Sequence, residues 1–240
     1  MPEFELWQWL LGCFCALLIG LAKSGVPGAG TLIVPLMVLT VGDARVTAAW
    51  TVTMLTVGDI FAVAYWHRKA DIGKLLSLIP WVALGMAGGA FALIFPEAVL
   101  RPIIGSVVLV MVTLTAFRHH PGVKAVGHTS FFGIAAGFAT TIANSAGPVM
   151  NMYLLSRGLP KERFVATAAW FFLVVNLAKA PIYVWHDLYS REGFAFNLVM
   201  IPIIITGNIA GIWVIHRIPQ RVFEILIIAL TIVSSITFFL

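Results

Sequence analysis

The sequence has few charged residues. Charged side chains make up 10% of its 240 positions, hydrophobic ones make up 60%, and the mean hydropathy is +1.00. A soluble protein of this length needs a more polar surface, so the composition excludes a soluble helical bundle. Lipid is therefore the expected solvent for most of the chain, and the basic excess behind its net charge of +5 is expected to set membrane topology.

Several motifs are missing as well. The chain has no P-loop, no GxSxG and no HExxH sequence, so neither ATP hydrolysis nor membrane proteolysis is indicated and no enzyme activity is expected. His119, His120 and His128 have no carboxylate or cysteine beside them, which favours a solvated linker over a metal site. No cofactor, metal or nucleic acid is predicted.

Cysteine is scarce, and the N-terminus has no basic stretch. Cys13 and Cys15 lie two residues apart in an apolar segment, where a disulfide within one helix is geometrically unfavourable, so both are expected to be small buried hydrophobic residues. Because no signal-peptide pattern precedes the first apolar run, residues 1–25 are expected to belong to the mature fold.

Long apolar stretches are abundant, and an internal repeat relates them. Residues 20–66 and 137–185 carry the same landmarks in the same order, which indicates a tandem duplication. The landmarks are Gly20 to Gly30 against Gly137 to Gly147, Thr47-Ala-Ala-Trp50 against Thr167-Ala-Ala-Trp170, Trp66-His67 against Trp185-His186, and Pro80, Gly85 and Gly89 against Pro202, Gly207 and Gly211.

The duplication predicts an all-α integral membrane protein of two repeats. A membrane span takes about 20 residues, so each repeat is a broken helical hairpin followed by three spans. The first repeat is 1–118, with its broken segment at 6–41 and spans at 44–66, 75–95 and 99–117. A cytoplasmic linker covers 119–128. The second repeat is 129–240, with its broken segment at 129–156 and spans at 164–185, 195–215 and 222–240. Whether the broken segments cross the membrane or re-enter stays open, and in both cases the two repeats have inverted topologies.

Loop charges indicate the orientation, because cytoplasmic loops are rich in Lys and Arg. With both termini outside, ten of the fifteen basic residues fall in inner loops: Arg68, Lys69, Lys74, Arg118, Lys124, Arg157, Lys161, Arg163, Arg217 and Arg221. Only Arg45, Arg101 and Arg191 fall in outer loops. Trp50, Trp66, Trp170 and Trp185 bracket two equivalent spans, as interfacial anchors do.

The two helix breaks are the predicted binding site. Irregular backbone at membrane depth is tolerated only where it lines a cavity or is buried in protein, and a restarting helix offers free N–H groups and a positive dipole end to an anion. The residues expected to bind are Lys23, Ser24, Gly25, Pro27, Gly28 and Gly30 in the first break and Thr140, Thr141, Asn144, Ser145 and Gly147 in the second. The alternative is that the glycines serve helix packing and that Lys23 reaches the surface.

Two ionisable residues lie in the middle of equivalent spans. An ionised side chain at the bilayer centre costs roughly 2.5–3.5 kcal/mol on insertion scales, so Asp59 and Lys179 each need a partner or a watery cavity. One reading pairs Asp59 with Lys179 or Lys23. The functional reading makes Lys179 and Asn176 anion contacts and Asp59 a group for proton coupling.

These motifs resemble those of the sulfite exporter TauE/SafE family over essentially the whole chain. The matching stretches are Gly20-Leu-Ala-Lys-Ser-Gly-Val-Pro-Gly-Ala-Gly-Thr-Leu-Ile-Val-Pro35, Gly133-Ile-Ala-Ala-Gly137 through Pro148, and Asn176-Leu-Ala-Lys179. The resemblance implies a secondary transporter in a bacterial inner membrane that moves sulfite or an organosulfonate such as sulfoacetate, by export, with no cofactor.

Three kinds of function follow from the sequence. The first is a carrier that exposes a midplane site between its repeats alternately to the two sides. The others are an anion channel, or carrier of another small oxyanion or carboxylate, and a scaffold subunit that transports nothing. The expected partners are a small anion and the bilayer, and the oligomeric state is left open, a homodimer included.

Overall fold

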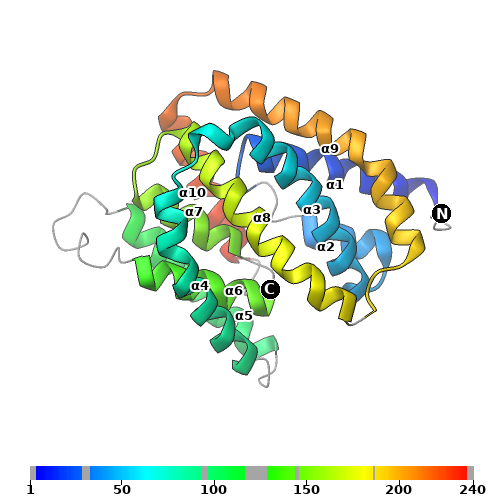
Figure 1. Cartoon of the computed structure of the whole chain (residues 1–240), viewed down its shortest axis with the longest axis horizontal. Helices are drawn as coiled ribbons and strands as arrows, with labels where there is room; N and C mark the ends of the chain where they lie inside the picture. The colour runs from blue at the N-terminus through cyan, green and yellow to red at the C-terminus, as the bar shows by residue number, and fades with distance from the viewer. Residues whose placement is uncertain are drawn as a thin grey trace. The chain divides into compact units, whose positions relative to one another are not determined.

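The computed structural model describes residues 4–28, 33–92, 97–116, 129–143, 146–185 and 187–236 (Figure 1). Within these ranges the regular elements are all helical, which confirms the all-α prediction. They are α1 (Leu6–Ser24), α2 (Ile33–Val41), α3 (Ala44–Trp66), the short 3-10 helix η2 (His67–Lys69), α4 (Ile72–Ala92), α5 (Glu97–Ala116), α6 (Thr129–Ala143), α7 (Ala146–Ser156), α8 (Lys161–Trp185), α9 (Arg191–Arg217) and α10 (Gln220–Ile236).

Five stretches in the described part of the chain are long and apolar enough to cross a membrane: Leu6–Ser24, Val46–Lys69, Ile72–Ala92, Lys161–Trp185 and Arg191–Arg217. The two helices of the second broken segment are different. With 15 residues in α6 and 11 in α7, neither reaches the roughly 30 Å of a hydrocarbon core at about 1.5 Å per residue. The described part of 129–156 thus consists of two short helices.

Capping residues decide where the later helices begin. The apolar runs predict starts at 75, 164 and 195, whereas α4, α8 and α9 begin at 72, 161 and 191. Asp71 accepts hydrogen bonds from the Lys74 and Leu75 amides, and the Ser190 side chain accepts one from the Gly193 amide. Polar first turns extend each helix beyond its apolar stretch, so those three predicted starts were late.

The chain forms two compact units. The first unit comprises residues 1–70 and 165–218, and the second comprises 71–164 and 219–240. Each unit takes segments from both sequence repeats.

In the first unit, α1 runs beside α9 in close contact (Figure 1). Glycines make this possible, because a methyl group on Gly20 would meet the Ile204 carbonyl and one on Gly25 would lie 2.5 Å from Gly211 Cα. Small residues that let two backbones approach are typical of helix contacts in membranes. Gly20 and Gly25 therefore let α1 pack closely against α9.

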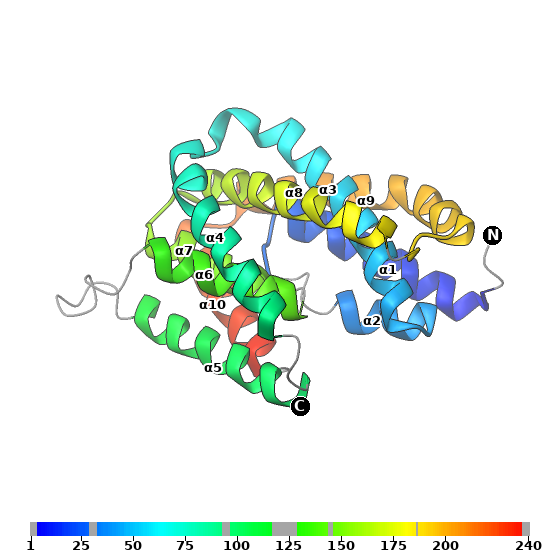
Figure 2. The same cartoon turned by 60° about the horizontal axis from the view of Figure 1, so that its bottom comes forward.

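In the second unit, α4 runs beside α6 in the same manner (Figure 2). A methyl group on Gly85 would meet the Ile134 carbonyl, and one on Gly137 would meet the Val82 carbonyl. By the sequence repeat, Gly137 corresponds to Gly20 and Gly85 corresponds to Gly207. The two units thus use equivalent contacts, in which the helix before each break packs against a helix from the other repeat.

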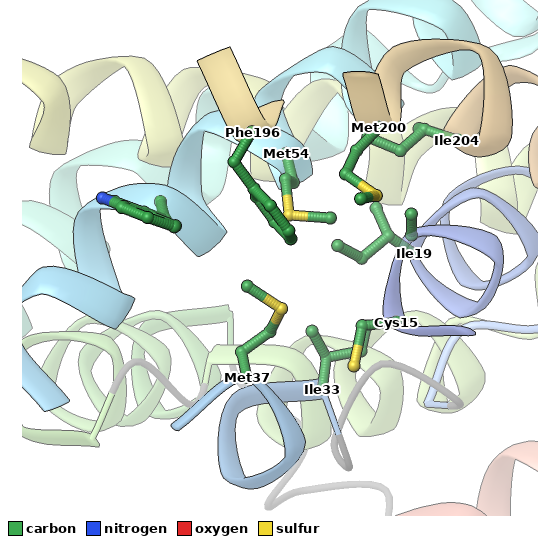
Figure 3. Packing of buried hydrophobic residues seen from close by; sticks show 10 residues of the cluster. Cys15, Ile19, Ile33, Met37, Met54, Phe196, Met200 and Ile204 are labelled. Atoms are coloured by element: carbon green, nitrogen blue, oxygen red, sulfur yellow. The ribbon is translucent and has the colours of Figure 1, made fainter. Parts of the chain in front are cut away.

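A hydrophobic cluster holds the first unit together. Side chains of α1, α2, α3 and α9 converge on it, and Cys15, Met37, Met54, Phe196 and Met200 are all fully buried there (Figure 3). Both cysteines are free thiols, Cys15 in this cluster and Cys13 partly buried beside it, as expected.

Trp50 and Trp66, which were predicted to be interfacial anchors, are buried. Trp50 and Trp66 are only 4% and 1% exposed, and they lie against Phe196 and His216, so neither faces lipid. Trp185 is 85% exposed and is free to lie at an interface. Packing by aromatic partners explains why the first two are buried.

Candidate functional site

The first helix break follows Ser24. Gly25 caps α1 by donating its amide hydrogen to the Leu21 carbonyl at 3.0 Å, and its close approach to Gly211 leaves no room for a side chain. Pro27 is buried, and Gly28 has a φ of +110°, a backbone conformation that favours glycine. The chain therefore leaves the helix tightly against α9.

In the last turn of α1, Lys23 forms an ion pair inside the first unit. Its Nζ lies 2.7 Å from Asp59 Oδ1 on α3, with the two side chains 10% and 0% exposed. Asn176 on α8 donates a hydrogen bond of 2.8 Å to Asp59 Oδ2. The Lys23 ammonium also lies 4.5 Å from the centre of the Phe172 ring. Three helices thus meet at one carboxylate.

A glycine makes room for the ion pair between the helices. Gly58, next to Asp59, lies under the aliphatic stem of Lys23, since a methyl group there would be 3.1 Å from Lys23 Cγ. Buried charges of this kind are stable only when they are paired and hydrogen-bonded. Of the two partners predicted for Asp59, Lys23 on α1 is in direct contact with it.

Lys179 is 7% exposed and lies on α8, one turn beyond Asn176. Its charge interacts electrostatically with both Asp59 and Lys23. The cluster of Lys23, Asp59, Asn176 and Lys179, which we call the charge cluster, therefore combines residues of both repeats within the first unit. The sequence predicted all four members.

The sequence interpretation missed Asn208. This residue of α9 is fully buried, and its side-chain oxygen accepts a hydrogen bond of 2.5 Å from the Ser24 hydroxyl at the end of α1. The sequence feature that could have revealed it is an amide side chain within an apolar run, which marks a polar contact between membrane helices. In the second unit the equivalent contact is weaker, from the Thr141 hydroxyl to the Met86 carbonyl at 3.5 Å.

The second break lies in the second unit and carries neutral groups. Thr140 is 3% exposed and Asn151, on α7, is 1% exposed; within the described ranges, the Thr140 hydroxyl and the Asn151 side-chain oxygen have no hydrogen-bond partner. Thr141 donates to the Gly137 carbonyl at 2.9 Å, and Gly147 has open space where a side chain would be. Asn151 is a second polar residue that the sequence interpretation missed.

The predicted binding residues therefore divide between the units. The first unit holds Lys23, Ser24, Gly25, Pro27, Gly28, Asp59, Asn176 and Lys179, and the second holds Thr140, Thr141 and Gly147. Gly30, Asn144 and Ser145 lie outside the described residues, as does the linker at 119–128 with its three histidines. Elsewhere in the described chain, no three His, Cys, Asp or Glu side chains gather as a metal site requires.

A comparison with known families decides the class of protein. A model of the sulfite exporter TauE/SafE family matches residues 12–238, nearly the whole chain. The chain belongs to the sulfite exporter TauE/SafE family. No curated protein and no solved structure was found to match it.

Membership of the TauE/SafE family gives the charge cluster its context. The protein is a multi-pass membrane transporter, not an enzyme, and its substrate is a small anion. In a TauE/SafE transporter, buried cations on facing helices are candidates for contact with that anion.

Proposed function

We propose that this transporter exports a small sulfur-containing anion, sulfite or an organosulfonate such as sulfoacetate, and that Lys23 and Lys179 bind its negative charge. The observation that carries the proposal is the charge cluster. With Lys23, Lys179 and Asp59 ionised, its described members sum to one positive charge on side chains that are at most 10% exposed. A small anion balances that charge.

Sulfonate and sulfite oxygens suit such a site. They accept several hydrogen bonds at once, and Asn176 and the two lysines supply donors from α1 and α8. Thr140 is a buried hydroxyl at the second break, in the other unit. In this proposal each break offers hydrogen-bond donors of its own to an anion.

Asp59 provides a route to proton coupling. When ionised, it competes with the anion for Lys23, to which it is paired at 2.7 Å. When protonated, it no longer holds that lysine by charge, and Lys23 becomes available to the anion. Proton and anion would then bind together and travel together.

We further propose that the two repeats have inverted topologies and that the transporter works by alternating access, with both termini on the periplasmic side of a bacterial inner membrane. The equivalent contacts of Gly20 with α9 and of Gly137 with α4 support a symmetric arrangement. The loop charges support the orientation.

A thermal-shift screen of the purified protein tests the substrate class. Sulfite, thiosulfate, sulfoacetate, taurine, sulfate and carboxylates are compared, and a bound anion is expected to raise the melting temperature. Lys23→Met and Lys179→Met should abolish the shift, whereas the control Lys69→Met, in the short helix η2 after α3, should keep it. Full anion stabilisation and full flux in both charge-cluster variants would show that these lysines do not bind the anion, whereas no stabilisation and no flux in the wild type would support a scaffold role.

Flux measurements in proteoliposomes test the mechanism. Saturable counterflow of the best anion is expected for a carrier, and an uncoupled conductance far above carrier turnover would indicate a channel. In Asp59→Asn, pH-driven transport should be lost while exchange persists. If both persist unchanged, Asp59 is not the coupling group.

A further inference from the structure

The proposed function leaves one contact of Lys23 unused. The Lys23 ammonium lies 4.5 Å from the centre of the Phe172 ring, within the roughly 6 Å over which the face of an aromatic ring attracts a cation. Lys23 is on α1 and Phe172 is on α8, so the contact joins two helices of the first unit. Lys23 thus has a second partner besides the carboxylate of Asp59.

The position of the Phe172 ring is fixed by its neighbour in the sequence. Phe171 is 2% exposed, and its ring meets that of Phe172 edge-on, with 5.3 Å between the ring centres and 75° between the planes. An edge-to-face pair of this kind is a favourable arrangement of two aromatic rings. The ring that contacts the ammonium is therefore held by a residue of the protein interior.

The stem of Lys23 is held as well. A methyl group on Gly58 would lie 3.1 Å from Lys23 Cγ and 3.2 Å from Ile19 Cγ2, so the lysine stem passes α3 at a position without a side chain. The Lys23 side chain is only 10% exposed. Its ammonium therefore lies between a carboxylate and an aromatic ring, with little contact with solvent.

The two partners stabilise the ammonium in different ways. Asp59 carries a full negative charge when ionised and balances that of Lys23, whereas an aromatic ring attracts a cation through its quadrupole and has no net charge. This attraction is stronger where the cation is removed from water. A ring can therefore keep the ammonium inside the protein and leave its charge available to an anion.

Phe172 belongs to the same face of α8 as two members of the charge cluster. Phe172, Asn176 and Lys179 follow one another at intervals of four and three residues, so they share one face of the helix over about 10 Å. The Asn176 amide donates to Asp59, and Lys179 interacts electrostatically with Asp59 and Lys23. This face of α8 supplies an amide, a cation and the ring to one site.

The sequence repeat links the ring to the lysine. By the repeat, Lys23 corresponds to Thr140 and Phe172 corresponds to Val52. The other copy of each position therefore has neither the cation nor the ring. The two partners of the contact occur together and are replaced together, as expected if the ring serves the lysine.

From these contacts we infer that Phe172 is a positioning residue for Lys23, whose ring keeps the ammonium at the charge cluster when the ion pair with Asp59 is released. In the proposed transport cycle, the release occurs when Asp59 takes up a proton. The charged groups around Asp59 in the described chain are Lys23 from α1 and Lys179 from α8. The role toward the anion rests on the proposed function, whereas the contact of the ring with Lys23 does not.

Fluorination of Phe172 tests the contact. Ring fluorines withdraw electrons and weaken the attraction for a cation, while the shape of the ring changes little. Phenylalanine with one, two or three ring fluorines is introduced at position 172 of the full-length protein, and thermal unfolding is measured in detergent. The melting temperature should fall with each fluorine. The fall should be steeper in Asp59→Asn, where the ring holds the ammonium without the carboxylate, and absent when Lys23→Met is added to Asp59→Asn.

A second buried ring provides the matched control. Phe196 is fully buried in the same unit and packs against the Trp50 ring. Fluorination of Phe196 should change the melting temperature by the same amount with and without Lys23.

Sulfite binding tests the role toward the anion. Phe172→Leu removes the ring and should raise the Kd of sulfite, measured from thermal shifts, about three- to thirtyfold. Phe172→Tyr keeps an aromatic ring and should restore most of the affinity. The trifluorinated protein keeps the shape of the side chain and should also have a raised Kd, which tests the role even if Phe172→Leu does not fold.

Two results would overturn the inference. One is a fluorine effect at Phe172 of equal size with and without Lys23, because the ring would then act through apolar packing alone. The other is an unchanged sulfite Kd in the trifluorinated protein and in folded Phe172→Leu. A wild type that does not bind sulfite would count against the proposed function, and the fluorine series alone would then decide for or against the contact with Lys23.

Discussion

Gly20 and Gly207 lie against each other where α1 contacts α9, so closely that a methyl group on Gly207 would be 3.1 Å from Gly20 Cα. Gly137 and Gly85 make the same contact between α6 and α4, with a methyl group on Gly137 3.0 Å from the Gly85 carbonyl carbon. Each pair packs two helices of one unit together, and each lies next to a helix break.

The contact in the second unit predicts that alanine substitutions at two nearby glycines of α4 have very different effects on stability. Gly85→Ala should destabilise the protein by about 1–3 kcal/mol, because the new methyl group meets the Ile134 carbonyl. Gly88, one turn later on α4, has nothing within 4 Å of such a methyl group, so Gly88→Ala is the matched control. It should be neutral or stabilising by up to about 1 kcal/mol. Thermal unfolding in detergent measures both, and equal melting temperatures would contradict the packing role.

The ion pair of Lys23 with Asp59 predicts strong coupling between two substitutions. Lys23→Met leaves a fully buried carboxylate without its cation and should cost about 3–5 kcal/mol. Combining it with Asp59→Asn should restore much of that stability, because no unpaired charge remains. A double-mutant cycle by reversible unfolding measures the coupling. Additive losses would show that the two side chains act independently.

The ion pairs of Asp71 with Lys74 and Arg163 should make an acid-sensitive contribution to the stability of the protein. The hydrogen bond from the Lys74 side chain is the main cause that lowers the pKa of Asp71, and an Arg163 side-chain nitrogen lies 3.3 Å from the same carboxylate oxygen. A carboxyl with a lowered folded pKa stabilises the protein above its unfolded pKa of about 4, and that stability is lost as the pH falls through the folded value. Both partners are partly exposed, so the contribution should be about 1 kcal/mol or less.

The check is the pH dependence of unfolding in wild type and Asp71→Asn. The variant should melt at a lower temperature at pH 7, and the difference should shrink as the pH approaches 3. A difference that is constant over this range would mean that the charge of Asp71 contributes nothing.

The loop charges predict the orientation of the C-terminus. A C-terminal alkaline phosphatase fusion should be active and a C-terminal green fluorescent protein fusion dark, because both report a periplasmic position. Fusions truncated after Gly158, in the loop with Arg157 and Lys161, should give the opposite pattern. The same pattern at both positions would contradict the proposed topology.

Much of this architecture follows from sequence patterns. The span at 44–66 and the short helices at 129–143 and 146–156 are visible in the sequence, because apolar length and helix breakers are local properties. The four members of the charge cluster were found in the same way, since ionisable residues within apolar runs are rare.

Other features depend on long-range contacts that no local pattern encodes. Asn208 looks like any amide in an apolar helix until α1 brings the Ser24 hydroxyl to it. Trp50 and Trp66 flank an apolar run as interfacial anchors do, and only the positions of Phe196 and His216 show that they are packed inside. Repeated glycines predict close contacts, but they do not say which helix each one touches.

Each unit combines helices from both repeats, and this has a consequence for biogenesis. α1 leaves the ribosome well before its partner α9, so its glycine face stays uncovered while the helices between them are made. A truncated product that stops after the first repeat keeps that face exposed, with no native partner to bury it. Assembly of the first unit thus waits for the synthesis of α9, and membrane quality control has a simple feature by which to recognise unfinished chains.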